Sequence, residues 1–132
     1  MTSAWEVLIF DDDLFFSSLI SGELDKTGLK SKVVTLTGIQ NQNFDTLGKV
    51  ICIVNLNAKK FDPYTLSRQL KLQNGVEVLG FCGHGQKDLM AKAKEAGCDW
   101  VVPNSVVAKG LTHFLKQQKL IVSADGKETQ KS

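Results

Sequence analysis

The stretch that decides the fold reads Val50-Ile-Cys-Ile-Val-Asn-Leu-Asn57. Its first five residues are apolar and mostly β-branched, which predicts a strand buried on both faces. Only a sheet covered by helices on both sides buries a strand in this way. The strand ends on Asn55, and ligands of open α/β sheets bind at the carboxyl ends of the strands. Because an amide is uncharged and a poor nucleophile, Asn55 decides whether this edge can perform chemistry.

The composition indicates one water-soluble domain. A chain of 132 residues with 42% hydrophobic and 23% charged residues suffices for one substantial core. A net charge of +2 is too small to attract nucleic acid or an anionic membrane. We find no apolar run long enough for a transmembrane helix and no signal-peptide pattern, so we expect a cytoplasmic protein. The three cysteines, Cys52, Cys82 and Cys98, lie in or beside apolar runs, as reduced buried thiols do.

Strands and helices are predicted to alternate along the rest of the chain. The expected strands are Trp5–Phe10, Lys32–Leu36, Val50–Asn55, Glu77–Cys82 and Trp100–Val102. The expected helices are Leu14–Lys26, a helix capped by Asp62 that ends near Leu72, Gln86–Ala96, and a last helix capped by Asn104 or Ser105. The polar segment 38–48 predicts a short irregular helix or a loop. This order calls for an α/β fold, a doubly wound five-stranded parallel sheet with helices on both faces.

The chain is expected to form one domain over residues 1–122. Residues 123–132 are polar and are expected to be a disordered tail or a linker.

Polar residues follow four of the five predicted strands. They are Asp11 and Asp12, Asn55 with Asn57, Cys82 at the end of the fourth strand, and Asn104. Because the carboxyl ends of parallel strands meet at one edge, we expect these side chains to gather there.

Four segments make the chain resemble the response-regulator receiver domain (CheY-like), the phosphoacceptor module of two-component signalling. They are Val7–Asp13, Val54–Asp62, Val78–Gly85 and Glu95–Pro103. The resemblance covers about residues 6 to 116, and it implies a flavodoxin-like, receiver-type fold.

The departures from the family pattern fall on the residues that would carry its chemistry. Asn55 stands in the place of the phosphorylated aspartate, and Cys82 in the place of a Thr or Ser hydroxyl that contacts the phosphoryl group. Asn104 and Ser105 replace a Lys-Pro pair, so the lysine is missing. The acidic pair Asp11 and Asp12 is retained.

These departures predict a pseudo-receiver, which is not an enzyme and requires no cofactor. Phosphoryl transfer needs an ionised nucleophile, and an amide at position 55 removes it. The lost lysine would have stabilised the transferred charge. Two carboxylates and an amide oxygen would bind Mg²⁺ only weakly, so the metal site at Asp11 and Asp12 is expected to be weak or vestigial.

Three roles for Asp11 and Asp12 remain open from the sequence. They could simply start the following helix, they could bind a divalent ion weakly, or a lysine could fold in to neutralise them. The lysines available for the third role are Lys59, Lys60 and Lys87.

The leading hypothesis is a signalling module that acts by contact with a regulatory protein. The family's usual contact face corresponds here to about residues 86–116. Its candidate interface residues are Lys87, Trp100, Lys109, His113 and Lys116. The lysines favour an acidic partner, and a homodimer through the last two helices would use the same face. Neither nucleic acid nor a membrane is expected. The alternative is a small-ligand or divalent-ion sensor that uses the pocket at the sheet edge. An enzyme or phosphoacceptor that uses Asp11 or Asp12 is the weakest hypothesis.

Overall fold

The computed structural model describes residues 6–41, 49–118 and 120. Five strands form one sheet in the order β2-β1-β3-β4-β5, and all neighbouring strands are parallel. The strands are β1 (Val7–Phe10), β2 (Ser31–Val33), β3 (Val50–Asn55), β4 (Val76–Cys82) and β5 (Trp100–Pro103). The strand order reverses between β1 and β3, and this switch point is where open α/β sheets bind ligands.

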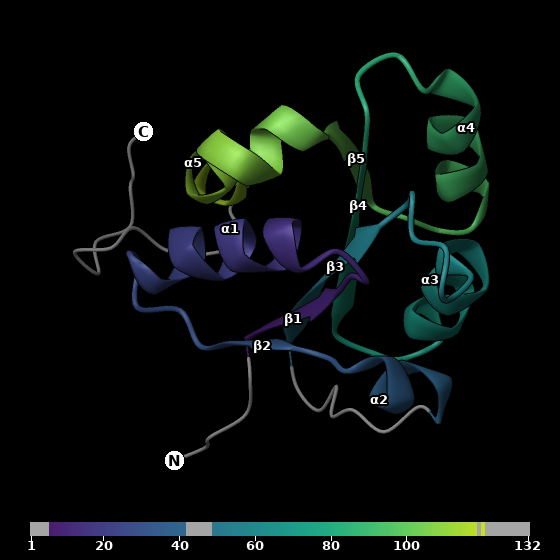
Figure 1. Cartoon of the computed structure of the whole chain (residues 1–132), viewed down its shortest axis with the longest axis horizontal. Helices are drawn as coiled ribbons and strands as arrows, with labels where there is room; N and C mark the ends of the chain where they lie inside the picture. Colours follow the sequence, from purple (N-terminus) through teal and green to yellow (C-terminus); the bar gives the residue numbers. More distant parts are fainter. Residues whose placement is uncertain (1–5, 42–48, 119, 121–132) are drawn as a thin grey trace.

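Helices cover both faces of the sheet, as Figure 1 shows. They are α1 (Leu14–Asp25), α2 (Leu36–Gln40), α3 (Pro63–Lys71), α4 (Lys87–Glu95), the π-helix η1 (Val106–Gly110) and α5 (Leu111–Gln117). Helices α1 and α5 lie on one face, and α2, α3 and α4 lie on the other (Figure 1). The doubly wound α/β fold is therefore confirmed.

Strand β3 separates the two halves of the hydrophobic core. All six of its residues are buried. Cys52 and Val54 belong to the core cluster under α2, α3 and α4, whereas Ile51 and Ile53 belong to the cluster under α1 and α5. Burying one side chain of this size stabilises the fold by roughly 1.5–3 kcal/mol. The strand that was predicted to be buried on both faces thus holds the two layers together.

Two helices begin at the carboxyl edge of the sheet with aspartate caps, and the cap at Asp62 was predicted. The Asp13 carboxylate accepts a hydrogen bond from the Phe15 amide at 2.9 Å, which fixes the start of α1. The Asp62 carboxylate accepts one from the Tyr64 amide at 3.0 Å, and Pro63 occupies the first helical position of α3. Each cap satisfies an amide that has no partner within its helix.

Two local predictions were wrong. The second strand ends at Val33 instead of Leu36, because the Thr35 hydroxyl accepts from the Gly38 amide at 2.9 Å and Leu36 starts α2. Neither Asn104 nor Ser105 caps the last helix. Both residues are helical, and Ser105 makes no capping bond to the π-helix that follows it.

Segment 42–48 and the tail 123–132 lie outside the described residues, so the predictions for them stay predictions. Within the part of the chain that the structure describes, no helix is both long and apolar enough to cross a membrane.

Candidate functional site

Asp11 and Asn55 lie side by side at the switch point of the sheet. Phe10 and Val54 are register partners in β1 and β3, so the residues that follow them are neighbours. The Asn55 Nδ2 donates a hydrogen bond to the Asp11 Oδ1 at 2.7 Å, and both residues are only 6% exposed. The negative charge of the buried Asp11 carboxylate is therefore stabilised by a neutral amide donor, at a position where a cation could otherwise neutralise it.

The Asp11 carboxylate has further donors from its own segment. Its Oδ1 also accepts from the Asp13 amide at 3.0 Å, and its Oδ2 accepts from the Ser17 hydroxyl at 3.1 Å. Burial raises the pKa of the Asp11 carboxyl above its usual value, although the hydrogen bonds from Asn55, Asp13 and Ser17 act to lower it. The desolvation of the charge thus outweighs these bonds.

Both the nitrogen and the oxygen of the Asn55 side-chain amide form hydrogen bonds. While its nitrogen donates to Asp11, its Oδ1 accepts from the Asn57 amide at 2.8 Å. Reversing the amide would place its oxygen against the Asp11 carboxylate and its NH₂ group against a backbone N–H. The neighbours therefore fix the orientation of Asn55, and its donor is the end that faces Asp11.

Asp12 connects two loops through backbone amides. Its Oδ2 accepts from the Lys59 N–H at 2.8 Å and from the Lys60 N–H at 3.0 Å, both in the loop between β3 and α3. No lysine ammonium in the described ranges forms an ion pair with Asp11 or Asp12. The hypothesis that a lysine side chain neutralises the acidic pair is therefore wrong in this structure. The lysines at 59 and 60 contribute their backbone instead.

A pair of side-chain amides joins the loops after β3 and β4. The Asn57 Nδ2 donates to the Gln86 Oε1 at 2.9 Å, and the Gln86 Nε2 donates back to the Asn57 Oδ1 at 3.1 Å. The Gln86 Oε1 also accepts from the Gly83 amide at 2.5 Å. Sequence reasoning missed the role of Gln86 because it was placed only as the start of a helix. It likewise missed the role of Ser17. The signal that could have indicated this role is a hydroxyl-bearing residue six positions after Asp11.

The Cys82 side chain belongs to the hydrophobic core. It is fully buried at the end of β4 and packs in the core cluster under α2, α3 and α4. Burial raises the pKa of its thiol, so the group is neutral near pH 7. Cys82 therefore behaves as a small hydrophobic residue in this structure.

An open cavity of about 570 Å³ lies beside the Asn55 side chain. Its polar lining includes Asp12, Asn55, Asn57, Lys59, Lys60 and Asn104. The structure thus brings most of the predicted edge residues to one cavity, but not Asp11 or Cys82.

The predicted interface residues are spread over four elements. Lys87 on α4, Lys109 on η1 and His113 on α5 are exposed, whereas Trp100 on β5 and Lys116 on α5 are half-buried. Trp100 packs against the core cluster under α1 and α5. Only part of this set is therefore fully available to a partner.

The acidic pair fits a magnesium ion poorly. Mg²⁺ requires several oxygen ligands in near-octahedral geometry. Here Asp11 faces an NH₂ donor, and Asp12 uses one oxygen for two backbone amides. Among the described residues, no three or more His, Cys, Asp or Glu side chains are grouped so that they could hold a metal ion.

Solved structures with the same arrangement of strands and helices are receiver domains. A CheY-like receiver domain protein from Methanospirillum hungatei is 19% identical, with a TM-score of 0.67 over 89% of this chain and 94% of that one. A putative response regulator from Chloroflexus aurantiacus is 18% identical, with a TM-score of 0.72 over 87% and 97%. This chain has the receiver-domain fold.

A third receiver domain contains a metal ion. It belongs to a sensor histidine kinase from Pseudomonas aeruginosa and has a magnesium ion coordinated in its active-site cleft. It is 15% identical, with a TM-score of 0.66 over 87% of this chain and 97% of that one. No protein-family model matches the sequence, and no curated protein matches it. At these identities, the likeness to receiver domains establishes the fold alone.

Proposed function

We propose that this chain is a receiver-like signalling module that accepts no phosphoryl group and acts by contact with a regulatory protein. The observation that carries this proposal is the 2.7 Å hydrogen bond from the Asn55 amide to the buried Asp11 carboxylate. The bond supplies from within the chain the compensation that a metal ion would otherwise give to Asp11.

The chemistry of the edge supports a loss of phosphoryl transfer. The Asn55 amide offers no ionised nucleophile in line with a donor. Asn104 at the start of the last helix carries no positive charge that would stabilise a transferred phosphoryl group. The proposal therefore includes no enzymatic activity and no required cofactor. It places the protein in cytoplasmic two-component-type regulation.

A contact function needs an accessible surface with a charge preference. Within residues 86–116, Lys87 and Lys109 are exposed and would favour an acidic partner. The same face would serve a homodimer through the last two helices.

A second candidate function is a sensor for a small polar ligand. The open cavity of about 570 Å³ favours it, because Asn104 lines this cavity and its side chain forms no hydrogen bond with another described residue. A saturable rise in melting temperature with one charged metabolite, lost in Asn104→Ala, would favour this sensor over the contact module.

The proposal is tested with a small phosphodonor and intact-protein mass spectrometry. The wild type is expected to gain no phosphoryl group in the presence of Mg²⁺ and acetyl phosphate. Asn55→Asp is the matched control, because it restores a carboxylate at the same position. A phosphorylated wild type whose modified residue is Asp11 or Asp12 would overturn the proposal.

A further inference from the structure

One asparagine of this chain stands in an exposed turn directly before a glycine. Asn74 and Gly75 lead from the end of α3 into Val76, the first residue of β4, and both are exposed. Gly75 has a φ of 83°, a backbone conformation that favours glycine because glycine has no Cβ. The conformation of the turn therefore explains why a glycine follows this asparagine.

The reactive groups of this pair are not held by hydrogen bonds. The Asn74 side chain and the Gly75 backbone N–H form no hydrogen bond with another described residue. Asparagine is chemically labile, because the backbone nitrogen of the next residue can attack its side-chain Cγ. A following glycine favours this attack, since no side chain blocks the approach. Neither group of the pair would have to break a hydrogen bond first.

Asn55 and Asn57 at the carboxyl edge differ from Asn74 in both respects. The N–H that follows Asn55 donates to the Phe81 carbonyl at 2.9 Å, and the N–H that follows Asn57 donates to the Asn55 carbonyl at 3.2 Å. Both side-chain amides are hydrogen-bonded as well. The same attack at these residues would have to break several bonds.

We propose that Asn74 is a site of spontaneous covalent modification, which converts it to aspartate and isoaspartate. The Gly75 nitrogen loses its proton and forms a bond to the Asn74 Cγ, while the Cγ–Nδ2 bond breaks and Nδ2 leaves as ammonia. The product is a five-membered succinimide ring. Water then opens the ring: addition at Cγ gives aspartate, and addition at the backbone carbonyl carbon gives isoaspartate. The reaction needs no oxidant, no reductant and no reagent besides water.

The products change both the charge and the geometry of the turn. Each product has a new carboxylate, so the formal net charge of +2 falls by one unit. Isoaspartate also adds one carbon atom to the main chain directly before Gly75. The Gly75 carbonyl accepts from the Val50 amide at 3.0 Å, and Val76 is the register partner of Val50. Isoaspartate should therefore loosen the start of β4 against β3.

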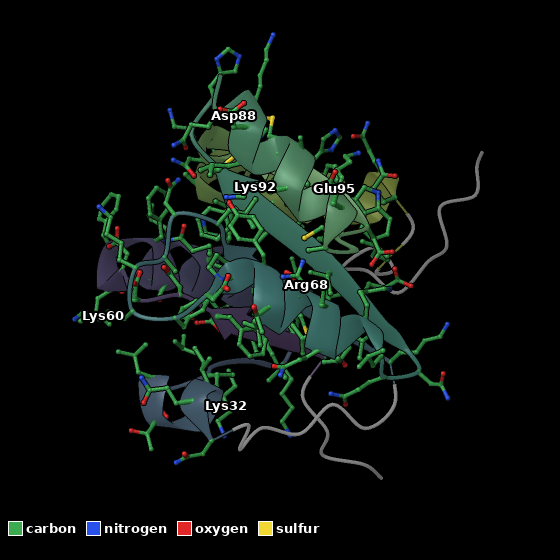
Figure 2. All side chains as sticks on the ribbon, turned by 90° about the vertical axis from the view of Figure 1, so that its right-hand side faces the viewer. Lys32, Lys60, Arg68, Asp88, Lys92 and Glu95 are labelled. Carbon is green, nitrogen blue, oxygen red and sulfur yellow. The ribbon has the colours of Figure 1, made fainter. Side chains whose placement is uncertain are left out.

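The turn and the candidate site lie at opposite edges of the sheet. Strand β4 runs from this turn to Cys82 at the carboxyl edge. Figure 2 shows the same separation along α3, because Lys60 stands before the helix on the side of the cavity and Arg68 lies in its last turn. The modification should therefore lower stability without changing the contact between Asp11 and Asn55.

Peptide mapping of the full chain tests the proposal. The protein is incubated above neutral pH, where the attacking nitrogen loses its proton more readily, in water labelled with heavy oxygen. Trypsin cleavage after Lys71 and Lys87 then releases a peptide with Asn74 as its sole asparagine. Asn74→Gln is the matched variant, because its longer side chain would have to close a larger ring. The tryptic peptide that contains Asn55 and Asn57 is the internal control.

We expect labelled isoaspartate and aspartate at Asn74, at a rate within about tenfold of that in an unstructured peptide of the same sequence, because exposed turns open at little cost. Asn55 and Asn57 should give at least about tenfold less product, because core strands open at a much higher free energy. Aged wild type should unfold at a lower urea concentration than fresh protein, whereas aged and fresh Asn74→Gln should not differ.

Three results would overturn the proposal. They are an Asn74 that stays unmodified after the unstructured peptide has reacted, aspartate without isoaspartate, which would mean that no ring forms, and isoaspartate-containing protein as stable as fresh protein. The proposed contact function stands apart from all three, because the phosphodonor assay does not depend on this turn.

Discussion

Replacing Asn55 by Asp tests the hydrogen bond on which the proposed function depends. In the wild type, the Asn55 amide donates to the Asp11 Oδ1 at 2.7 Å in a buried setting. Asn55→Asp changes a donor into a carboxylate of nearly the same shape. Two buried carboxylates would then compete for the same contact, and no cation among the described residues forms an ion pair with either position.

The cost can be estimated from this distance. Two unit charges 2.7 Å apart repel by about 6 kcal/mol at an effective dielectric of about 20. Protonating one carboxyl avoids this repulsion and restores a donor. At pH 7, this protonation costs about 4 kcal/mol, because the ordinary pKa of Asp lies about three units lower. Protonation costs less free energy than the repulsion, so one carboxyl should be protonated in the folded variant. Asn55→Asp should therefore lose about 4 kcal/mol of unfolding free energy at pH 7.

The pH dependence distinguishes this mechanism from a simple packing defect. The pKa of the new carboxyl pair is raised in the folded state, so the folded protein binds more protons than the unfolded chain. The variant should therefore regain about 1.4 kcal/mol for each pH unit from 7 down to about 4. Asn55→Ala is the matched control. It removes the donor without adding a charge, so it should lose roughly 1.5–3 kcal/mol. Because the lost bond lowers the pKa of Asp11, part of this loss should fade at low pH, but with a smaller slope than in Asn55→Asp.

Urea unfolding at pH 5, 6 and 7, with and without Mg²⁺, measures these quantities. Mg²⁺ should raise the urea midpoint of Asn55→Asp, because the cation separates the two carboxylates, and should leave the wild type unchanged. An Asn55→Asp variant as stable as the wild type at pH 7 without metal would refute the reasoning.

Three further substitutions test individual contacts by urea unfolding. Asp11→Asn should stabilise the protein at pH 7, because burial raises the pKa of Asp11 and the new amide oxygen can still accept from Asn55. This gain in unfolding free energy should vanish as the pH falls below 3.8, the ordinary pKa of an aspartate, and a loss of stability at pH 7 would contradict the prediction. Asp62→Ala should cost about 1 kcal/mol at pH 7. Hydrogen bonds lower the pKa of Asp62, so this difference should fade as the pH drops through that lowered pKa, and a constant difference would contradict the cap. Asp99→Ala should cost roughly 1–2 kcal/mol, because the Val78 amide loses its 2.8 Å acceptor, and an unchanged midpoint would exclude this role.

The fold followed from patterns that act over a few residues. The apolar run at Val50–Val54 has one interpretation in a short chain, a strand covered on both faces. Asp62 and Pro63 are also local signals, and α3 begins where they predict. The error at Leu36 has a local cause as well, because the Thr35 cap competed with a β-branched run and ended the strand early.

The site was only partly predictable, because its contacts join residues far apart in the chain. Topology placed Asp11 and Asn55 at the same edge, but the direction of their hydrogen bond depends on which neighbours face each end of the amide. The use of the Lys59 backbone instead of its ammonium group to hold Asp12 depends on the path of the loop. No sequence pattern encodes that path.

The most direct test of the central claim is the two-dimensional amide NMR spectrum with and without Mg²⁺ and beryllofluoride. If Asn55 has replaced both the phosphoacceptor and the need for a cation at Asp11, the spectrum should stay unchanged at saturating concentrations. Saturable shifts centred on Asn55, Cys82 and Asn104 would contradict the account, because the edge would then still bind a phosphoryl-like group.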